Sequence, residues 1–119
     1  MPSPVRVPLA EVAELGRLVS RFPPGAVLAM QDSPRRYVGR DAIARFLASP
    51  AGGGLDRVAL IATRANCEPA IAVYRFEPRD RAFLAHAIFV LIGSGRPADV
   101  FGAADASLFP YFGLPATIE

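Results

Sequence analysis

The chain has 119 residues, 52% of them hydrophobic and 20% charged, with a formal net charge of +2. This length and composition are typical of one globular domain, and they exclude an intrinsically disordered chain or a chain of two domains. All thirteen basic residues are arginines, interleaved with eleven carboxylates rather than gathered in a stripe. Nucleic acid is therefore not an expected partner.

No apolar run approaches the ~20 residues that a membrane-spanning helix requires, the longest being residues 82–92. The first residues lack the charged and apolar regions of a signal peptide. Cys67 is the single cysteine, which excludes an intramolecular disulfide, and no spacing of His, Cys or carboxylates is typical of a metal site. We therefore expect a cytoplasmic protein that has no membrane contact, no metal and no other cofactor.

Helical periodicity occurs twice in the first half of the chain. After a proline-rich lead, which we expect to be flexible over residues 1–7, apolar residues recur in steps of three and four over residues 9–22. Residues 40–48 have the same spacing and are followed by a proline and a run of glycines. These patterns predict two amphipathic helices.

Strands are predicted between and after these helices. The short apolar run 25–31 predicts one strand, and the polar segment 32–39 after it predicts a loop. From residue 56 the period changes to two, which predicts four strands at residues 56–65, 70–77, 82–92 and 98–103. Their short, turn-rich connections favour an antiparallel meander, and residues 105–112 form one last helical turn. The order of elements predicts an α+β fold in which helices cover one face of an antiparallel sheet.

The predicted strand 82–92 is apolar at both its odd and its even positions. An antiparallel strand with one solvent-exposed face should instead alternate polar and apolar residues. Helices can cover one face, so the other face must also be covered. We expect a homodimer formed by packing of the two sheets, the alternative being that the chain's own tail covers this face.

Four stretches of the chain resemble one protein family. They are YVGRDAIARFLA (37–48), RANCEPAIAVYRF (64–76), AHAIFVLI (85–92) and SLFPYFGLP (107–115). They are similar to the SnoaL-like, nuclear-transport-factor-2-like domain at the C-terminus of actinobacterial extracytoplasmic-function sigma factors. That family has Gly-Arg-x-Ala-Ile at the start of a helix, an Asn-Gly-x-Pro-Ala hairpin and a closing Phe-Gly-Leu-Pro.

The resemblance implies a cone-shaped, cystatin-like fold, in which a curved antiparallel sheet packs on N-terminal helices around an apolar pocket. It also implies that residues 1–119 form a single SnoaL-like domain. Two departures matter. Cys67 replaces the hairpin glycine, so a tight turn with positive φ would be strained there. The sigma-factor domains that read promoter DNA are absent from this sequence.

The resemblance implies three classes of function. The first is a small-molecule-binding domain, derived from a sigma-factor tail and regulatory in role, that takes a small apolar or aromatic molecule without catalysis. The second is an enzyme of SnoaL type (an isomerase, cyclase or epoxide hydrolase) that uses acid/base catalysis on a small apolar substrate. The third is a module that binds a protein partner. We favour the first.

Asp32 and His86 are the candidate catalytic residues. An enzyme of this type needs a base in an apolar pocket, and Asp32 follows the first predicted strand, where the pocket mouth is expected. His86 lies among aliphatic residues in the middle of a strand and could orient Asp32 if the two come within hydrogen-bonding reach. The alternatives are that Asp32 is a turn residue and that His86 is a core or interface histidine whose ring is hydrogen-bonded.

The candidate ligand-binding residues are aromatic, aliphatic and cationic side chains of the predicted pocket: Tyr37, Phe46, Arg64, Tyr74, Ile88 and Val90. Arg64 and Arg75 lie on the two strands of one predicted hairpin, where they could form a clamp for an anionic ligand. The alternatives are packing for the tyrosines and ion pairs with neighbouring carboxylates for the arginines.

Overall fold

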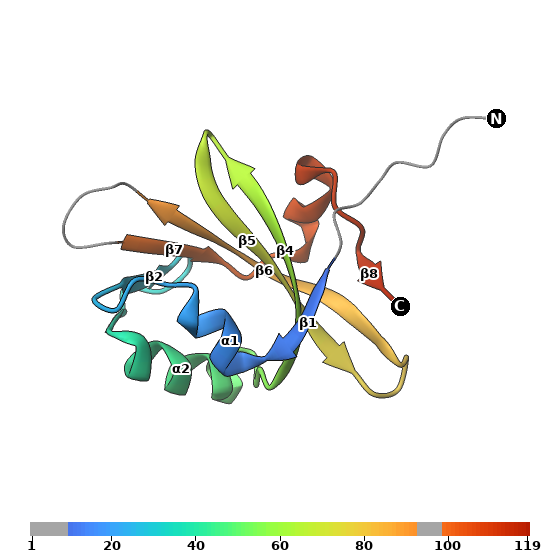
Figure 1. Cartoon of the computed structure of the whole chain (residues 1–119), viewed down its shortest axis with the longest axis horizontal. Helices are drawn as coiled ribbons and strands as arrows, with labels where there is room; N and C mark the ends of the chain where they lie inside the picture. Colours follow the sequence, from blue (N-terminus) through green and yellow to red (C-terminus); the bar gives the residue numbers. More distant parts are fainter. Residues whose placement is uncertain (1–9, 93–98) are drawn as a thin grey trace.

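A computed structural model describes residues 10–92 and 99–119 as one mixed sheet with the α-helices on one face (Figure 1). The strands are β1 (Glu11–Glu14), β2 (Val27–Met30), β3 (Arg36–Val38), β4 (Arg57–Ala65), β5 (Glu68–Glu77), β6 (Ala82–Ile92), β7 (Asp99–Ala103) and β8 (Thr117–Ile118). The helices are α1 (Leu15–Ser20), α2 (Arg40–Ala48) and two 3-10 helices, η1 (Pro50–Gly52) and η2 (Ala106–Phe112). The predicted α+β class is thus confirmed.

The second half of the chain forms the predicted meander. Strands β4, β5, β6 and β7 are neighbours in the sheet, and each pair is antiparallel. The sheet is nevertheless mixed, because β2 pairs with β7 in parallel and carries β3 at the edge. The prediction of a purely antiparallel sheet was wrong because local patterns do not specify the direction in which distant strands pair.

The N-terminal prediction also needs correction. The helix predicted over residues 9–22 is helical only from Leu15 to Ser20, and Glu11–Glu14 instead pairs with β4 as strand β1. Backbone pairing with β4 overrides the helix propensity of Glu11–Glu14, and no side chain caps the start of α1. The predicted loop 32–39 contains β3, and the predicted flexible lead (1–7) lies outside the described residues.

The β4–β5 hairpin turns through two residues, Asn66 and Cys67. Their φ angles are 50° and 70°, and the flanking residues Ala65 and Glu68 pair directly. Positive φ at both central positions is the conformation of a type I′ turn, for which Asn-Gly is the preferred pair. The tight turn is therefore kept although cysteine stands where glycine is favoured.

The sheet has a buried core on each face. On the first face, α1 and α2 pack against the sheet through residues such as Leu18, Ile43 and Phe89. On the second face, η2 and the last residues cover β4, β5 and β6 (Figure 1), with Phe109 and Leu114 buried there. The chain's own tail thus covers part of the face for which a partner subunit was expected.

Tyr74 anchors this C-terminal segment to the second face. Its ring is fully buried and lies edge-on to Phe109 at 5.1 Å, and its hydroxyl donates a 2.8 Å hydrogen bond to the Pro115 carbonyl. Burial raises the pKa of Tyr74 to about 12. The tail is thus fixed by a specific polar contact as well as by apolar packing.

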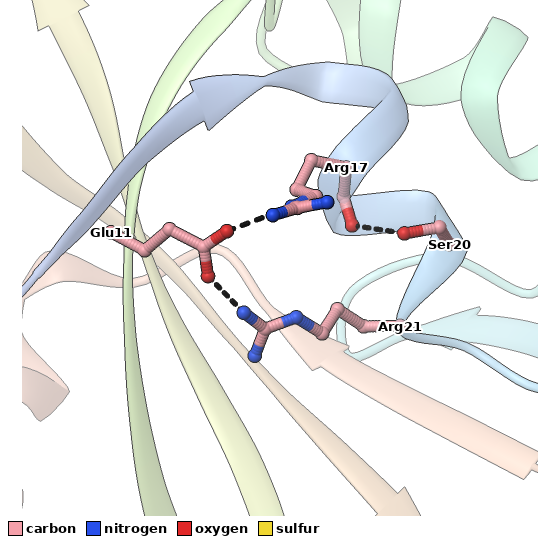
Figure 2. Close-up of polar contacts among 4 residues, drawn as sticks. All are labelled: Glu11, Arg17, Ser20 and Arg21. Atoms are coloured by element: carbon pink, nitrogen blue, oxygen red, sulfur yellow. Dashed lines mark hydrogen bonds and ion pairs between the residues drawn. The ribbon is translucent and has the colours of Figure 1, made fainter.

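Arginines join the N-terminal elements to each other. Arg40, at the start of α2, donates from Nε to the Phe22 carbonyl (2.8 Å) and from Nη2 to the carbonyls of Phe22 (2.5 Å) and Ser20 (3.1 Å). It thereby satisfies the Ser20 carbonyl, left free at the end of α1, and the carbonyl of Phe22 just after it. Figure 2 shows a second link, in which Glu11 of β1 accepts from Arg17 Nε (2.9 Å) and from Arg21. The hydrogen bond from Arg17 lowers the pKa of Glu11.

Candidate ligand pocket

A cavity of about 340 Å³ opens at one end of the first face, beside the turn between β2 and β3 and the end of α2. Its lining comes from separate parts of the chain: Met30, Asp32, Ser33, Arg35, Tyr37, Phe46, Ala51 and Ala104. This volume lies at the lower end of the range found for small-molecule sites, and the mixture of apolar and polar lining is typical of them. The predicted residues Asp32, Tyr37 and Phe46 all meet here.

Two stacked aromatic rings form one wall of the cavity. Tyr37 of β3 and Phe46 of α2 lie with their centroids 4.1 Å apart and their planes inclined by only 19°. The pairing of Tyr37 with Leu28, a core residue of the first face, turns the Tyr37 ring towards α2. Neither ring is fully buried, so this wall can accept an apolar or aromatic molecule.

The rim of the cavity is polar. The turn after β2 is ordered by hydrogen bonds from the Ser33 amide to the Met30 carbonyl (3.3 Å) and from the Arg35 amide to Ser33 Oγ (3.2 Å). Across residues 10–92 and 99–119, the exposed carboxylate of Asp32 makes no hydrogen bond and no ion pair. Asp32 and Arg35 therefore place one anion and one cation where a ligand would enter.

His86 does not lie in this cavity. The register of β5 and β6 shifts by one residue, Val73 pairing with Ala87 and Tyr74 with Ala85, so His86 is the extra residue of a β-bulge. Its ring lies against Gly53, where a Cβ would be 2.5 Å from both Cε1 and Nε2. Burial lowers the pKa of His86, a hydrogen bond with the Gly52 backbone opposes this, and the charge of Arg75 lowers it further. The structure thus does not bring Asp32 and His86 together.

The remaining predicted ligand residues are also separate from the cavity. Tyr74 and Ile88 are buried in the second-face core, and Val90 packs against it. Arg64 lies at the β4–β5 hairpin end, beside a shallow groove of about 450 Å³ that Tyr111 and Phe112 also line. These residues therefore cannot form one site with Tyr37 and Phe46, which lie on the opposite face.

The predicted anion clamp of Arg64 and Arg75 is wrong. Arg64 pairs with Pro69 near the hairpin turn, whereas Arg75 pairs with Val58 at the far end of the same two strands. Arg64 and Arg75 are thus six residues apart along the paired strands, a distance of about 20 Å at the rise per residue of a β-strand. Arg75 instead forms an ion pair with Glu77, with 3.9 Å between Arg75 Nη1 and Glu77 Oε2.

The acidic side chains of the chain are all at least partly exposed. All eleven carboxylates lie in the described ranges, and none of them is buried. Among residues 10–92 and 99–119, no three His, Cys, Asp or Glu side chains are arranged to hold a metal ion. In that same part of the chain, no buried side-chain nitrogen or oxygen lacks a hydrogen-bond partner.

Five cavity residues were not predicted from the sequence: Met30, Ser33, Arg35, Ala51 and Ala104. Met30 and Arg35 flank the turn after the first predicted strand, so proximity to Asp32 was the one available signal. Ala51 and Ala104 have side chains without distinctive chemistry, and only the tertiary fold brings them to the cavity.

No protein-family model matches this chain, and no curated protein matches it. Within the described part of the chain, none of the helices has the length and apolar character needed to cross a membrane.

Proposed function

We propose that this chain is a small-molecule-binding domain of SnoaL-like type, derived from a sigma-factor tail, and that it binds its ligand without catalysing a reaction. The observation that supports this proposal most directly is the cavity of about 340 Å³, with its wall of stacked Tyr37 and Phe46 rings and its polar rim. The α+β architecture, with the α-helices on one face of a twisted sheet, supports the cone-shaped, nuclear-transport-factor-2-like fold that the sequence resemblance implies.

The ligand class follows from the lining. A small aromatic molecule can lie against Tyr37 and Phe46, while its polar substituent faces Asp32 or Arg35 at the rim. Removing about 100 Å² of apolar ligand surface from water contributes about 2.5 kcal/mol at ~25 cal/mol per Å². A hydrogen bond to a charged rim group contributes about 1.5–3 kcal/mol more.

Binding is favoured over the SnoaL-type enzyme because the required acid/base pair is not assembled. A general base of that type is a carboxylate desolvated by an apolar pocket, whereas Asp32 is exposed and His86 lies against Gly53. The cavity also favours ligand binding over a pure protein-interaction module, because such a module does not require a cavity with an aromatic wall.

We also propose a homodimer through the part of the second face that the tail leaves open. We call this the outer patch; its apolar members are Val27, Ala29, Val38, Val90, Ile92 and Phe101. Val38, Ile92 and Phe101 are 68%, 45% and 37% exposed, which is unusual for large apolar side chains. Arg36 and Asp99 share this face, so a two-fold axis can place Arg36 of one copy opposite Asp99 of the other.

Fluorescence titration with 1-anilinonaphthalene-8-sulfonate, a small aromatic anion, tests the binding proposal. We expect Phe46→Ala to weaken probe binding about tenfold, because it removes half of the aromatic wall. Phe112→Ala, a partly buried aromatic outside the cavity, is the matched control. Equal affinities in the wild type and Phe46→Ala would contradict the assignment of the site.

Sedimentation tests the dimer separately. Phe101→Asp should shift a dimer towards monomer, since it places a charge in the middle of the outer patch. The wild type sedimenting as a monomer at tens of micromolar would contradict this part of the proposal.

A further inference from the structure

The loop between α2 and β4 connects His86 to the candidate cavity. This loop, Ser49–Leu55, contains three consecutive glycines and places Ala51 in the cavity wall. On one side it is held by α2, with hydrogen bonds from Ser49 Oγ to the Phe46 carbonyl (2.5 Å) and from the Leu55 amide to the Leu47 carbonyl (2.8 Å). Gly52 lies so close to α2 that a Cβ would clash with the Phe46 carbonyl.

On the other side, the loop is held by His86. The β-bulge in β6 sets the imidazole under the loop, in contact with Gly53, and a backbone hydrogen bond joins the ring to Gly52. Gly53 has a φ of 108°, a conformation that L side chains rarely adopt, so this close approach depends on glycine. His86 therefore contacts the two residues that directly follow Ala51.

Burial and the charge of Arg75 favour the neutral form of His86, and together they outweigh the backbone contact with Gly52, which favours the protonated form. Arg75 of β5 is the charged group that acts on the ring, and it carries the same sign that a protonated imidazole would have. Residues 49–55 contain no titratable side chain, and Asp56 and Arg57 follow at the loop's end, where they line a groove with Arg75. The nearest carboxylate on β5, Glu77, is already paired with Arg75.

We propose that His86 is a positioning residue for the cavity: its neutral imidazole packs under the Ser49–Leu55 loop and fixes it, and a proton on the ring places a charge in a half-buried position beside Arg75, which loosens this loop and the Ala51 wall. The cavity is then well formed near neutral pH and altered in mildly acidic solution. Only the role given to the cavity rests on the proposed function, because the contacts of His86 do not depend on any ligand.

The sign of this effect follows from linkage. Because burial lowers the pKa of His86 in the folded protein, the unfolded chain takes up the proton at a higher pH. The contribution of His86 to folding is therefore present above the unfolded pKa of about 6.5, and it is lost as the pH falls through the folded pKa.

The chain contains one histidine, so an NMR titration of the free protein tests the proposal without any ligand. We expect the His86 ring signal to titrate with a midpoint below 6.5, and the Ala51 methyl and the amides of Gly52 and Gly53 to shift with that same midpoint. His86→Gln, which preserves hydrogen bonding but does not titrate, should remove that transition from the loop signals. Asp32→Asn is the matched control, because it removes the cavity's own carboxylate and should leave the transition unchanged.

The proposal is wrong if the loop signals do not change at the His86 midpoint, or if that midpoint lies at or above about 6.5. Both outcomes can be read from the wild type, even if His86→Gln fails to fold. As a second readout, affinity for 1-anilinonaphthalene-8-sulfonate should fall about fivefold from pH 7.5 to 5.0 in the wild type, as expected for weakly coupled sites. If the probe does not bind but the loop titrates with His86, the proposed function fails and this inference stands.

Discussion

Replacing Cys67 with glycine should stabilise the folded chain, although it removes a side chain. Cys67 has a φ of 70°, and holding a residue other than glycine in the left-handed region costs roughly 1–2 kcal/mol. Glycine avoids this strain but loses about 0.5–1 kcal/mol more backbone entropy on folding. The exposed thiol has little packing to lose, and the 3.3 Å hydrogen bond from Arg64 Nη1 goes to the Cys67 backbone carbonyl, which remains.

The expected net gain in the free energy of unfolding is therefore about 0.5–1 kcal/mol. At about 2.1 cal/mol/K of unfolding entropy per residue, this gain corresponds to a rise in Tm of about 2–4 °C. Urea unfolding at equal m-value, with a thermal melt beside it, measures the change. Cys67→Ser is the matched control, because it removes the thiol, keeps the strained φ and should leave stability nearly unchanged. A destabilised Cys67→Gly, or an equal gain in both variants, would refute the argument from backbone strain.

Substitutions at four further positions test the fold. Arg40→Ala should lower the free energy of unfolding by about 2–3 kcal/mol, because three hydrogen bonds to carbonyls at the end of α1 are lost, and Arg40→Lys should recover only part of this in urea unfolding. Tyr74→Phe should lower stability by about 1 kcal/mol at pH 7. Because the pKa of Tyr74 is raised to about 12, the wild type should lose stability as the pH rises from about 10 to 12, and alkaline melts of Tyr74→Phe should lack that loss. Gly52→Ala should lower the free energy of unfolding by about 1–3 kcal/mol, because a Cβ at this position clashes with α2. Gly16→Ala lies in open space on α1 and should raise it by about 0.5–1 kcal/mol. Equal effects of the two substitutions in thermal melts would contradict the packing described here.

The elements with strong local signals could be predicted from the sequence. The limits of α2 (Arg40–Ala48) and β6 (Ala82–Ile92) agree with the predicted ones to the residue, because helical spacing, proline and turn residues mark their ends. Strands β1 and β3 could not be predicted in this way. Both are short and exist because β4 and β2 offer backbone partners, which is information held in the tertiary structure.

The candidate site was predictable only in part, for a related reason. Asp32, Tyr37 and Phe46 were each selected for their chemistry, and the fold brings all three to one cavity. Ile88 was assigned to the wrong face because β6 is apolar on both faces, so that alternation could not tell the helix side from the tail side. The position of His86 depends on a β-bulge that the sequence does not mark.

Native mass spectrometry of the gently purified wild type, compared with Phe46→Ala, tests the central claim most directly. We expect a wild-type dimer that carries a discrete additional mass of small-molecule size, and a Phe46→Ala protein that has lost this mass. The same mass at the same occupancy in both proteins would show that the ligand lies outside the Tyr37–Phe46 cavity, and would contradict the account.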